Sequence, residues 1–240
     1  VEDPAYGELD PDYVFGLHNI PGVPRKELVL RRGTFAAASR GVIIDLQGKT
    51  SHAGEPENGL NPVHAMGRLI PIIGEIPRRD DYEGFVLITI IHLRLGDPAF
   101  GTSPGKGAVM LTLRSHSDAD MEKLVERVEG AARREAAAEG LGVSIRHTEI
   151  FPAVVNDEEC MDLVEEAAAD TGEVTAGWRD EPFRWSEDFS YLLNRDRGAF
   201  FGLGSGTDQP DLHNPDYDFP DELIAAGSAM FFALYRRLLG

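Results

Sequence analysis

The segments FVLITIIHLRL, residues 85–95, and AVMLTLR, residues 108–114, decide the fold of the middle of this chain. Both are rich in β-branched and long apolar residues, and a Gly- and Pro-containing connection separates them, which predicts two successive strands in a hairpin. A strand and a helix precede the hairpin, and a helix and a strand follow it, at residues 41–47, 61–73, 118–139 and 143–150. The order β-α-β-β-α-β predicts a ferredoxin-like α+β sandwich.

The residues on either side of the sandwich have a different, α/β character. Tyr13 to His18 is typical of a strand that ends at His18, because the turn-forming residues 19–22 follow it. After the sandwich, the patterns predict a helix from Asp157, a short strand at 199–203 and a terminal helix at 220–239. We therefore expect one α/β domain interrupted by an insertion. Its segments are residues 1–40 and 152–240, and the inserted sandwich is residues 41–151.

Composition excludes several classes of function. The net charge of −18 and a pI near 4.7 argue against nucleic acid and anionic membrane surfaces as partners. No apolar run near eighteen residues occurs, and the acidic N-terminus lacks the apolar segment of a signal peptide. The single cysteine, Cys160, excludes an internal disulfide. We expect a soluble cytoplasmic protein, and the missing initial methionine suggests that the chain begins in mid-protein.

Two histidines lie in the same short sequence motif, one in each segment of the expected α/β domain. Leu-His-Asn occurs around His18 and again around His213, each time before a proline turn. A neutral imidazole is the commonest protein ligand of a transition metal, although a histidine in such a turn also caps local backbone. Glu187 and Asp188 precede a predicted helix, where they either assist a metal site or only favour the helix dipole. Catalytic zinc usually takes three protein ligands, so two imidazoles do not complete a site.

Five motifs in order show that the sequence resembles the M20 metallopeptidases, in the branch of N-acyl-amino-acid, hippurate and indole-acetyl-amino-acid hydrolases. The motifs are VFGLHN at 14–19, GKTSHAGEP at 48–56 with Asn61-Pro62, AFGTSP at 99–104 leading to TLR at 112–114, SEDF at 186–189 and LHNP at 212–215. They cover nearly the whole chain. The match corresponds to the C-terminal two-thirds of the family.

The resemblance implies a zinc-peptidase-like α/β domain with an inserted lid, and hydrolysis of an amide bond in an N-acyl amino acid or small peptide. It assigns His18 and His213 to two divalent metal ions, with zinc, manganese and nickel open, and implies a homodimer formed through the lid. It also implies that His52 enters the neighbouring subunit's site and polarises the scissile carbonyl, and that Arg114 receives the substrate carboxylate. From the residues alone, the ordinary interpretation of His52 is a turn or surface histidine, and that of Arg114 is a strand-end arginine exposed to water.

Two departures from the family qualify these expectations. Gly101 stands where many relatives carry an asparagine that donates to the substrate. The Gly-Cys-Gly-His-Asp type segment and the Glu-Glu pair, which supply the remaining ligands and the general base, are absent. We therefore expect this chain alone to be inactive or nearly so.

Two other functions remain open at this point. One is a non-catalytic dimerising protein with a vestigial metal site. The other is a free-standing ferredoxin-like module, which predicts that His18 and His213 lie apart, whereas a shared metal pair requires their rings within roughly 8 Å.

Overall fold

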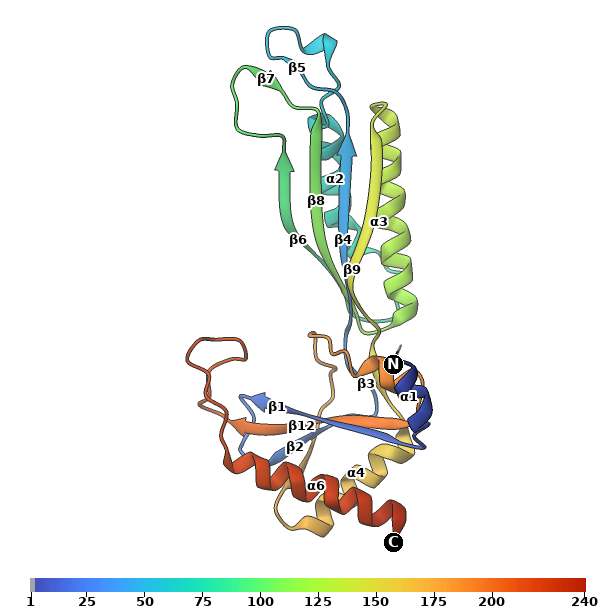
Figure 1. The fold of residues 1–240 in the computed structure, drawn as a ribbon, viewed down its shortest axis with the longest axis vertical. Helices are drawn as coiled ribbons and strands as arrows, with labels where there is room; N and C mark the ends of the chain where they lie inside the picture. The colour runs from blue at the N-terminus through green and yellow to red at the C-terminus, as the bar shows by residue number, and fades with distance from the viewer. Residues whose placement is uncertain (1–2) are drawn as a thin grey trace. The chain divides into compact units, whose positions relative to one another are not determined.

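The computed structural model describes residues 3–240, which divide into two compact units. Unit 1 consists of two segments, the residues up to Ala37 and Pro152–Gly240. Unit 2 is Ala38–Phe151. Each unit is described by itself below (Figure 1). Across residues 3–240, no helix combines the length and the apolar character needed to cross a lipid bilayer.

Unit 2 is built on a four-stranded sheet in the order β6-β8-β4-β9, with all neighbours antiparallel. The strands are β4 (Ala38–Gln47), β6 (Val86–Leu95), β8 (Lys106–Ser115) and β9 (Gly142–Phe151). Helices α2 (Val63–Glu75) and α3 (Asp118–Ala138) lie on one face of this sheet (Figure 1). This is the βαββαβ order, so the predicted ferredoxin-like sandwich is confirmed. Smaller elements are β5 (Ser51–His52), β7 (Thr102–Ser103) and the 3₁₀ turns η1 (Pro56–Asn58) and η2 (Ile76–Arg78).

The core of unit 2 follows from the two periodicities. Val109, Leu111 and Leu113 alternate along β8 and are buried, as alternate residues of a strand face one side of a sheet. Along α3, residues three and four apart, such as Leu124 and Val128, are buried against that side. Burial of each such aliphatic side chain contributes about 1.5–3 kcal/mol.

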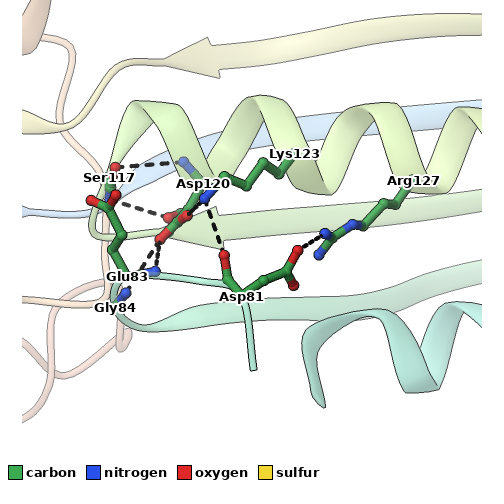
Figure 2. A network of polar contacts seen from close by, with 8 residues as sticks. Asp81, Glu83, Gly84, Ser117, Asp120, Lys123 and Arg127 are labelled. Carbon is green, nitrogen blue, oxygen red and sulfur yellow. Dashed lines mark hydrogen bonds and ion pairs between the residues drawn. The ribbon is translucent and has the colours of Figure 1, made fainter. Parts of the chain in front are cut away.

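A network of polar contacts fixes the start of α3 (Figure 2). The hydroxyl of Ser117 caps the helix by accepting from the Asp120 amide. The carboxylate of Asp120, which is completely buried, accepts from the backbone amides of Glu83 and Gly84 at 2.9 and 3.2 Å. Lys123 donates to the other oxygen of Asp120 at 2.9 Å. These contacts attach α3 to the segment that leads into β6.

Unit 1 contains a four-stranded sheet in the order β1-β12-β2-β11. Its strands are β1 (Val14–Pro21), β2 (Glu27–Leu30), β11 (Thr175–Trp178) and β12 (Gly198–Gly206). β1 is parallel to β12, and β2 is antiparallel to β12. Helices α4 (Glu158–Thr171) and α6 (Glu222–Leu239) lie together against one face (Figure 1). The remaining elements are α1 (Pro4–Leu9), α5 (Ser190–Leu193) and the antiparallel pair β3 (Gly33–Ala36) and β10 (Val154–Asn156).

β12 separates two apolar clusters because its side chains alternate between the faces of the sheet. Ala199, Phe201 and Leu203 pack with α4 and α6 on one face. Phe200 joins the second cluster on the other face, which includes Phe35 and Phe183. All nine residues of β12 are buried, which is typical of a central strand covered on both sides. The second cluster supports the surface where the candidate site lies.

Candidate functional site

His18 lies on β1, where a backbone carbonyl orients its ring. Nδ1 of His18 is 2.8 Å from the carbonyl oxygen of Asn19. Because a carbonyl oxygen only accepts, Nδ1 carries the proton and Nε2 keeps a free lone pair. Nε2 is 3.8 Å from Oε2 of Glu187, and the ring centroid is 5.6 Å from that of Trp185. A histidine fixed in this tautomer by its other nitrogen is prepared to bind a metal through Nε2.

The position of His18 differs in one respect from the sequence expectation. The strand does not end at His18 but continues to Pro21, because its parallel pairing with β12 runs on to Gly206. The turn-forming residues Asn19 to Pro21 are therefore still paired, and the register shifts only between Ile20 and Pro21. His18 lies near the carboxyl end of β1 rather than at it.

Glu187 is half-buried in the segment before the short helix α5. Burial raises the pKa of its carboxyl above the usual value, Asp188 raises it further, and His18 opposes the rise. The backbone amide of Asp188 donates to Oε1 of Glu187 at 3.1 Å, and Asp188 itself is exposed. α5 begins at Ser190, after both acids, and has four residues. The dipole of α5 therefore does not account for an acidic residue at position 187. A partly desolvated carboxylate beside an imidazole is suited to binding a cation.

His213 lies in the loop between β12 and α6. Its backbone has φ = 69°, in the left-handed region, where histidine is found more often than most residues other than glycine. The Asn214 amide donates to the carbonyl of Asp211 at 3.2 Å, and the Tyr217 amide donates to the carbonyl of Asn214 at 3.1 Å. These two turns form the loop around an exposed imidazole.

His18 and His213 line the same cavity, whose volume is about 560 Å³. Glu187 also lines it. Its other lining residues are Ile20, Pro21, Phe183, Trp185, Ser186, Asp211 and Leu212. Within residues 3–240, no group of three or more His, Cys, Asp or Glu side chains is placed to hold a metal ion. The cavity is nevertheless lined by two histidines and two acidic residues, Glu187 and Asp211, and the chemistry of these donor types fits a divalent transition metal.

His52 and Arg114 both belong to unit 2, at opposite ends of its sheet. His52 pairs with Thr102 in the small β5–β7 ribbon, and the Gly48 amide donates to the carbonyl of Gly105, which precedes the start of β8. Arg114 lies near the other end of β8 and pairs with Ser39 at the start of β4. A strand rises about 3.3 Å per residue, so the length of β8 places the two side chains roughly 25 Å apart.

The environments of these two side chains also differ. Nδ1 of His52 accepts from the Gly54 amide at 3.1 Å, so its proton is on Nε2, and the residue is exposed. Arg114 is half-buried, and burial lowers the pKa of its guanidinium while Glu149 opposes this. His52 is therefore able to donate a hydrogen bond through Nε2, and Arg114 remains a cation with a planar donor surface.

The sequence did not predict two features, one of the cavity wall and one outside the cavity lining. One is the aromatic wall, in which Trp185 stacks on Phe183 with ring centroids 4.7 Å apart. The other is Tyr217, whose hydroxyl accepts from the side-chain amide of Asn19. The only signal for Tyr217 was an aromatic residue in an acidic turn, which by itself is not informative.

Comparisons with known proteins identify the family to which this chain belongs. The family described as Peptidase family M20/M25/M40 matches residues 2–237. Hippurate hydrolase of Campylobacter jejuni is 27% identical over 241 residues, covering 100% of this chain and 62% of the relative. N-acetyldiaminopimelate deacetylase of Oenococcus oeni is 30% identical over 224 residues, covering 90% of this chain and 56% of the relative. The chain spans about three fifths of the length of these relatives.

Two solved structures share the fold. A putative aminohydrolase from methicillin-resistant Staphylococcus aureus superposes with a TM-score of 0.83 at 18% identity, covering 96% of this chain and 60% of that one. The YXEP protein of Bacillus subtilis, described as a dinuclear metal-binding peptidase, superposes with a TM-score of 0.77 at 21% identity, covering 98% and 60%. At these identities the likeness shows the fold alone.

Proposed function

The chain belongs to peptidase family M20/M25/M40, and from this membership we propose that the protein hydrolyses an amide bond in an N-acyl amino acid or small peptide with two divalent metal ions. The observation that carries the proposal is that His18 and His213, far apart in sequence, line one cavity. The names of the similar hippurate hydrolase and N-acetyldiaminopimelate deacetylase support an N-acyl amino acid as the substrate class. Zinc, manganese and nickel all suit the donor set.

We propose that His18 and His213 each hold one metal, with Glu187 and Asp188 assisting from the surrounding shell. Bound divalent metals supply an activated water and polarise the amide carbonyl. The carbonyl of Asn19 keeps the His18 proton on Nδ1, so Nε2 is available as a ligand. Glu187, 3.8 Å from that nitrogen, offsets positive charge at the site. We assign no residue of this chain to the general base.

We propose that residues 41–151 act as the lid and that residues 1–40 and 152–240 belong to the catalytic domain. In the lid, Arg114 receives the substrate carboxylate through its planar guanidinium. His52 donates from Nε2 to the scissile carbonyl, as its bond from the Gly54 amide allows. Because β8 separates these two side chains, His52 would act in the site of a second copy.

A homodimer formed through the lid also explains an exposed apolar edge. β6 is the outer strand of its sheet, and its exposed side chains include Ile91, which is 60% exposed, and Leu93, which is 47% exposed. A long apolar edge strand with unpaired backbone groups is unfavourable in water unless another chain covers it. We propose that a second copy of this chain pairs along β6.

Metal binding and hydrolysis test the proposed function directly. Zinc, manganese and nickel content and affinity are measured for the wild type, His18→Ala and His213→Ala, with the exposed His64→Ala on α2 as the matched control. Release of glycine from hippurate, and of amino acids from N-acetyl substrates, is assayed on this chain beside a version extended at its N-terminus.

We expect the two site variants to lose metal and the control to keep it. Hydrolysis is expected to depend on His18 and His213 in whichever form is active. Equal metal affinity in the wild type and in both site variants would contradict the assignment. Metal binding without hydrolysis in either form would indicate a vestigial site.

A further inference from the structure

Two backbone turns lie within the loop that carries His213, residues 207–219. These bonds, from the Asn214 and Tyr217 amides, determine the shape of the loop. They do not determine where the loop lies relative to β1, which carries His18. Loops with few buried contacts are among the first parts of a protein to open, so the distance between the two imidazoles depends on contacts that leave the loop.

One such contact joins the loop to β1. The side-chain amide of Asn19 donates to the hydroxyl of Tyr217 at 2.5 Å. Tyr217 is half-buried, whereas its neighbours Asp216 and Asp218 are exposed. The aromatic ring therefore turns from the loop toward the body of unit 1, and its hydroxyl reaches the residue next to His18.

Asn19 connects both histidines through two different groups. Its backbone carbonyl accepts from His18 Nδ1, which sets the tautomer of that ring. Its side-chain amide holds Tyr217, four positions after His213. Since both histidines line one cavity, a single residue links the ring of the first to the loop of the second.

We propose that Tyr217 is a positioning residue, which through Asn19 holds the His213 loop against β1 so that both imidazoles face one cavity. This inference rests on the proposed metal site. The left-handed backbone of His213 adds to the need for an external restraint, because such a conformation persists when surrounding contacts fix it. Removing the Tyr217 hydroxyl leaves every proposed metal ligand in the chain and breaks only the bond that holds the His213 loop to β1. Groups that orient ligands in this way typically contribute about 10–100-fold to metal affinity.

The test is a double-mutant cycle with Tyr217→Phe, Asn19→Ala and the double variant. Tyr235→Phe on α6 is the matched control, because that tyrosine is 58% exposed and lies outside the cavity lining. Zinc dissociation constants come from competition with a chromophoric chelator. Amide hydrogen exchange of the metal-free chain reports on residues 207–219 without any need for metal, and urea unfolding reports on global stability.

We expect each single variant to weaken zinc binding by about tenfold and the double variant to be no weaker than either, because all three lack the same bond. Exchange of the Asn214 and Tyr217 amides should accelerate in each, with the urea midpoint unchanged, and the control should match the wild type. Unchanged affinity in Tyr217→Phe overturns the inference, as do losses that add in the double variant. If the wild type itself binds no zinc, manganese or nickel, the proposed function fails, and the positioning role fails with it even if the exchange responds.

Discussion

The thiol of Cys160 is buried at the start of α4, which makes its protonation a test of the packing there. Burial and the neighbouring Asp157 raise the pKa of Cys160 to about 12. An unfolded thiol ionises near pH 9, so folding keeps the proton, and the resulting stability is present below pH 9 and is lost as the pH rises toward 12. We expect no reaction with a thiol reagent at pH 8 until the protein unfolds. The measurement is the labelling rate with and without urea.

The control for Cys160 is Cys160→Ala, which removes this titration. The difference in urea midpoint between the wild type and the variant should change above pH 9 and stay constant below it. Rapid labelling of the folded wild type would show that the α4 packing described here is wrong.

Asp120 is a second residue whose surroundings make a sharp prediction. One oxygen accepts from two backbone amides and the other from Lys123, so no position suits an amide NH₂ group. We expect Asp120→Asn to lower the free energy of unfolding by about 1–3 kcal/mol, because it places a donor against donors in a buried site. Urea unfolding of this variant beside Glu126→Gln, an exposed site on α3, measures the effect. Equal midpoints for the two variants would contradict the network in Figure 2.

Among the elements, β1 and β12 pair so closely that glycine is required at Gly198. A Cβ atom there would lie 1.9 Å from the carbonyl oxygen of Val14. In α2, by contrast, a Cβ atom at the exposed Gly67 would meet nothing within 4 Å. We expect Gly198→Ala to destabilise the protein by about 2–3 kcal/mol and Gly67→Ala to stabilise it by about 0.5–1 kcal/mol. Thermal unfolding of both variants checks the opposite signs, and a tolerated Gly198→Ala would mean that β1 and β12 are not paired as described.

The long elements were predictable from the sequence because their apolar periods are sustained. The predicted helix at 118–139 is α3, Asp118–Ala138, and the predicted hairpin strands are β6 and β8 within two residues at each end. Short strands such as β2 and β11 were not predicted, since four residues are too few to establish a period. The end of β1 was placed too early because turn-forming residues there are held by pairing with β12, which local sequence does not reveal.

At the scale of the whole molecule, the candidate site depends on contacts between distant segments. The Leu-His-Asn motif that His18 and His213 share indicated a common role for them, and both line one cavity. Their roles as ligands, like those of Glu187, Asp188, His52 and Arg114, stay predictions. Tyr217 and the wall formed by Phe183 and Trp185 could not be predicted, because their significance arises only when the fold brings Tyr217 to Asn19 and Trp185 to His18.

The proposed homodimer makes a prediction that no single copy can satisfy. If His52 acts in the partner's site while His18 binds metal in its own, then His52→Ala and His18→Ala are each inactive. Mixing the two through unfolding and refolding should restore about a quarter of wild-type turnover, because half of the dimers of a two-fold assembly are then mixed and each carries one intact site. The measurement is hydrolysis of an N-acyl amino acid by the active form of the protein.

The controls separate assembly from chemistry. Ile91→Lys on β6 should dissociate the dimer in sedimentation and abolish the recovery, because it places a charge on the proposed interface. In a mixture of His18→Ala with His213→Ala, every catalytic domain carries one lesion if the two histidines act within the same chain, so no intact site can form. No recovery is therefore expected from that mixture. Recovery there, or its failure for His52→Ala with His18→Ala, would contradict the assignment of His52 to the second copy.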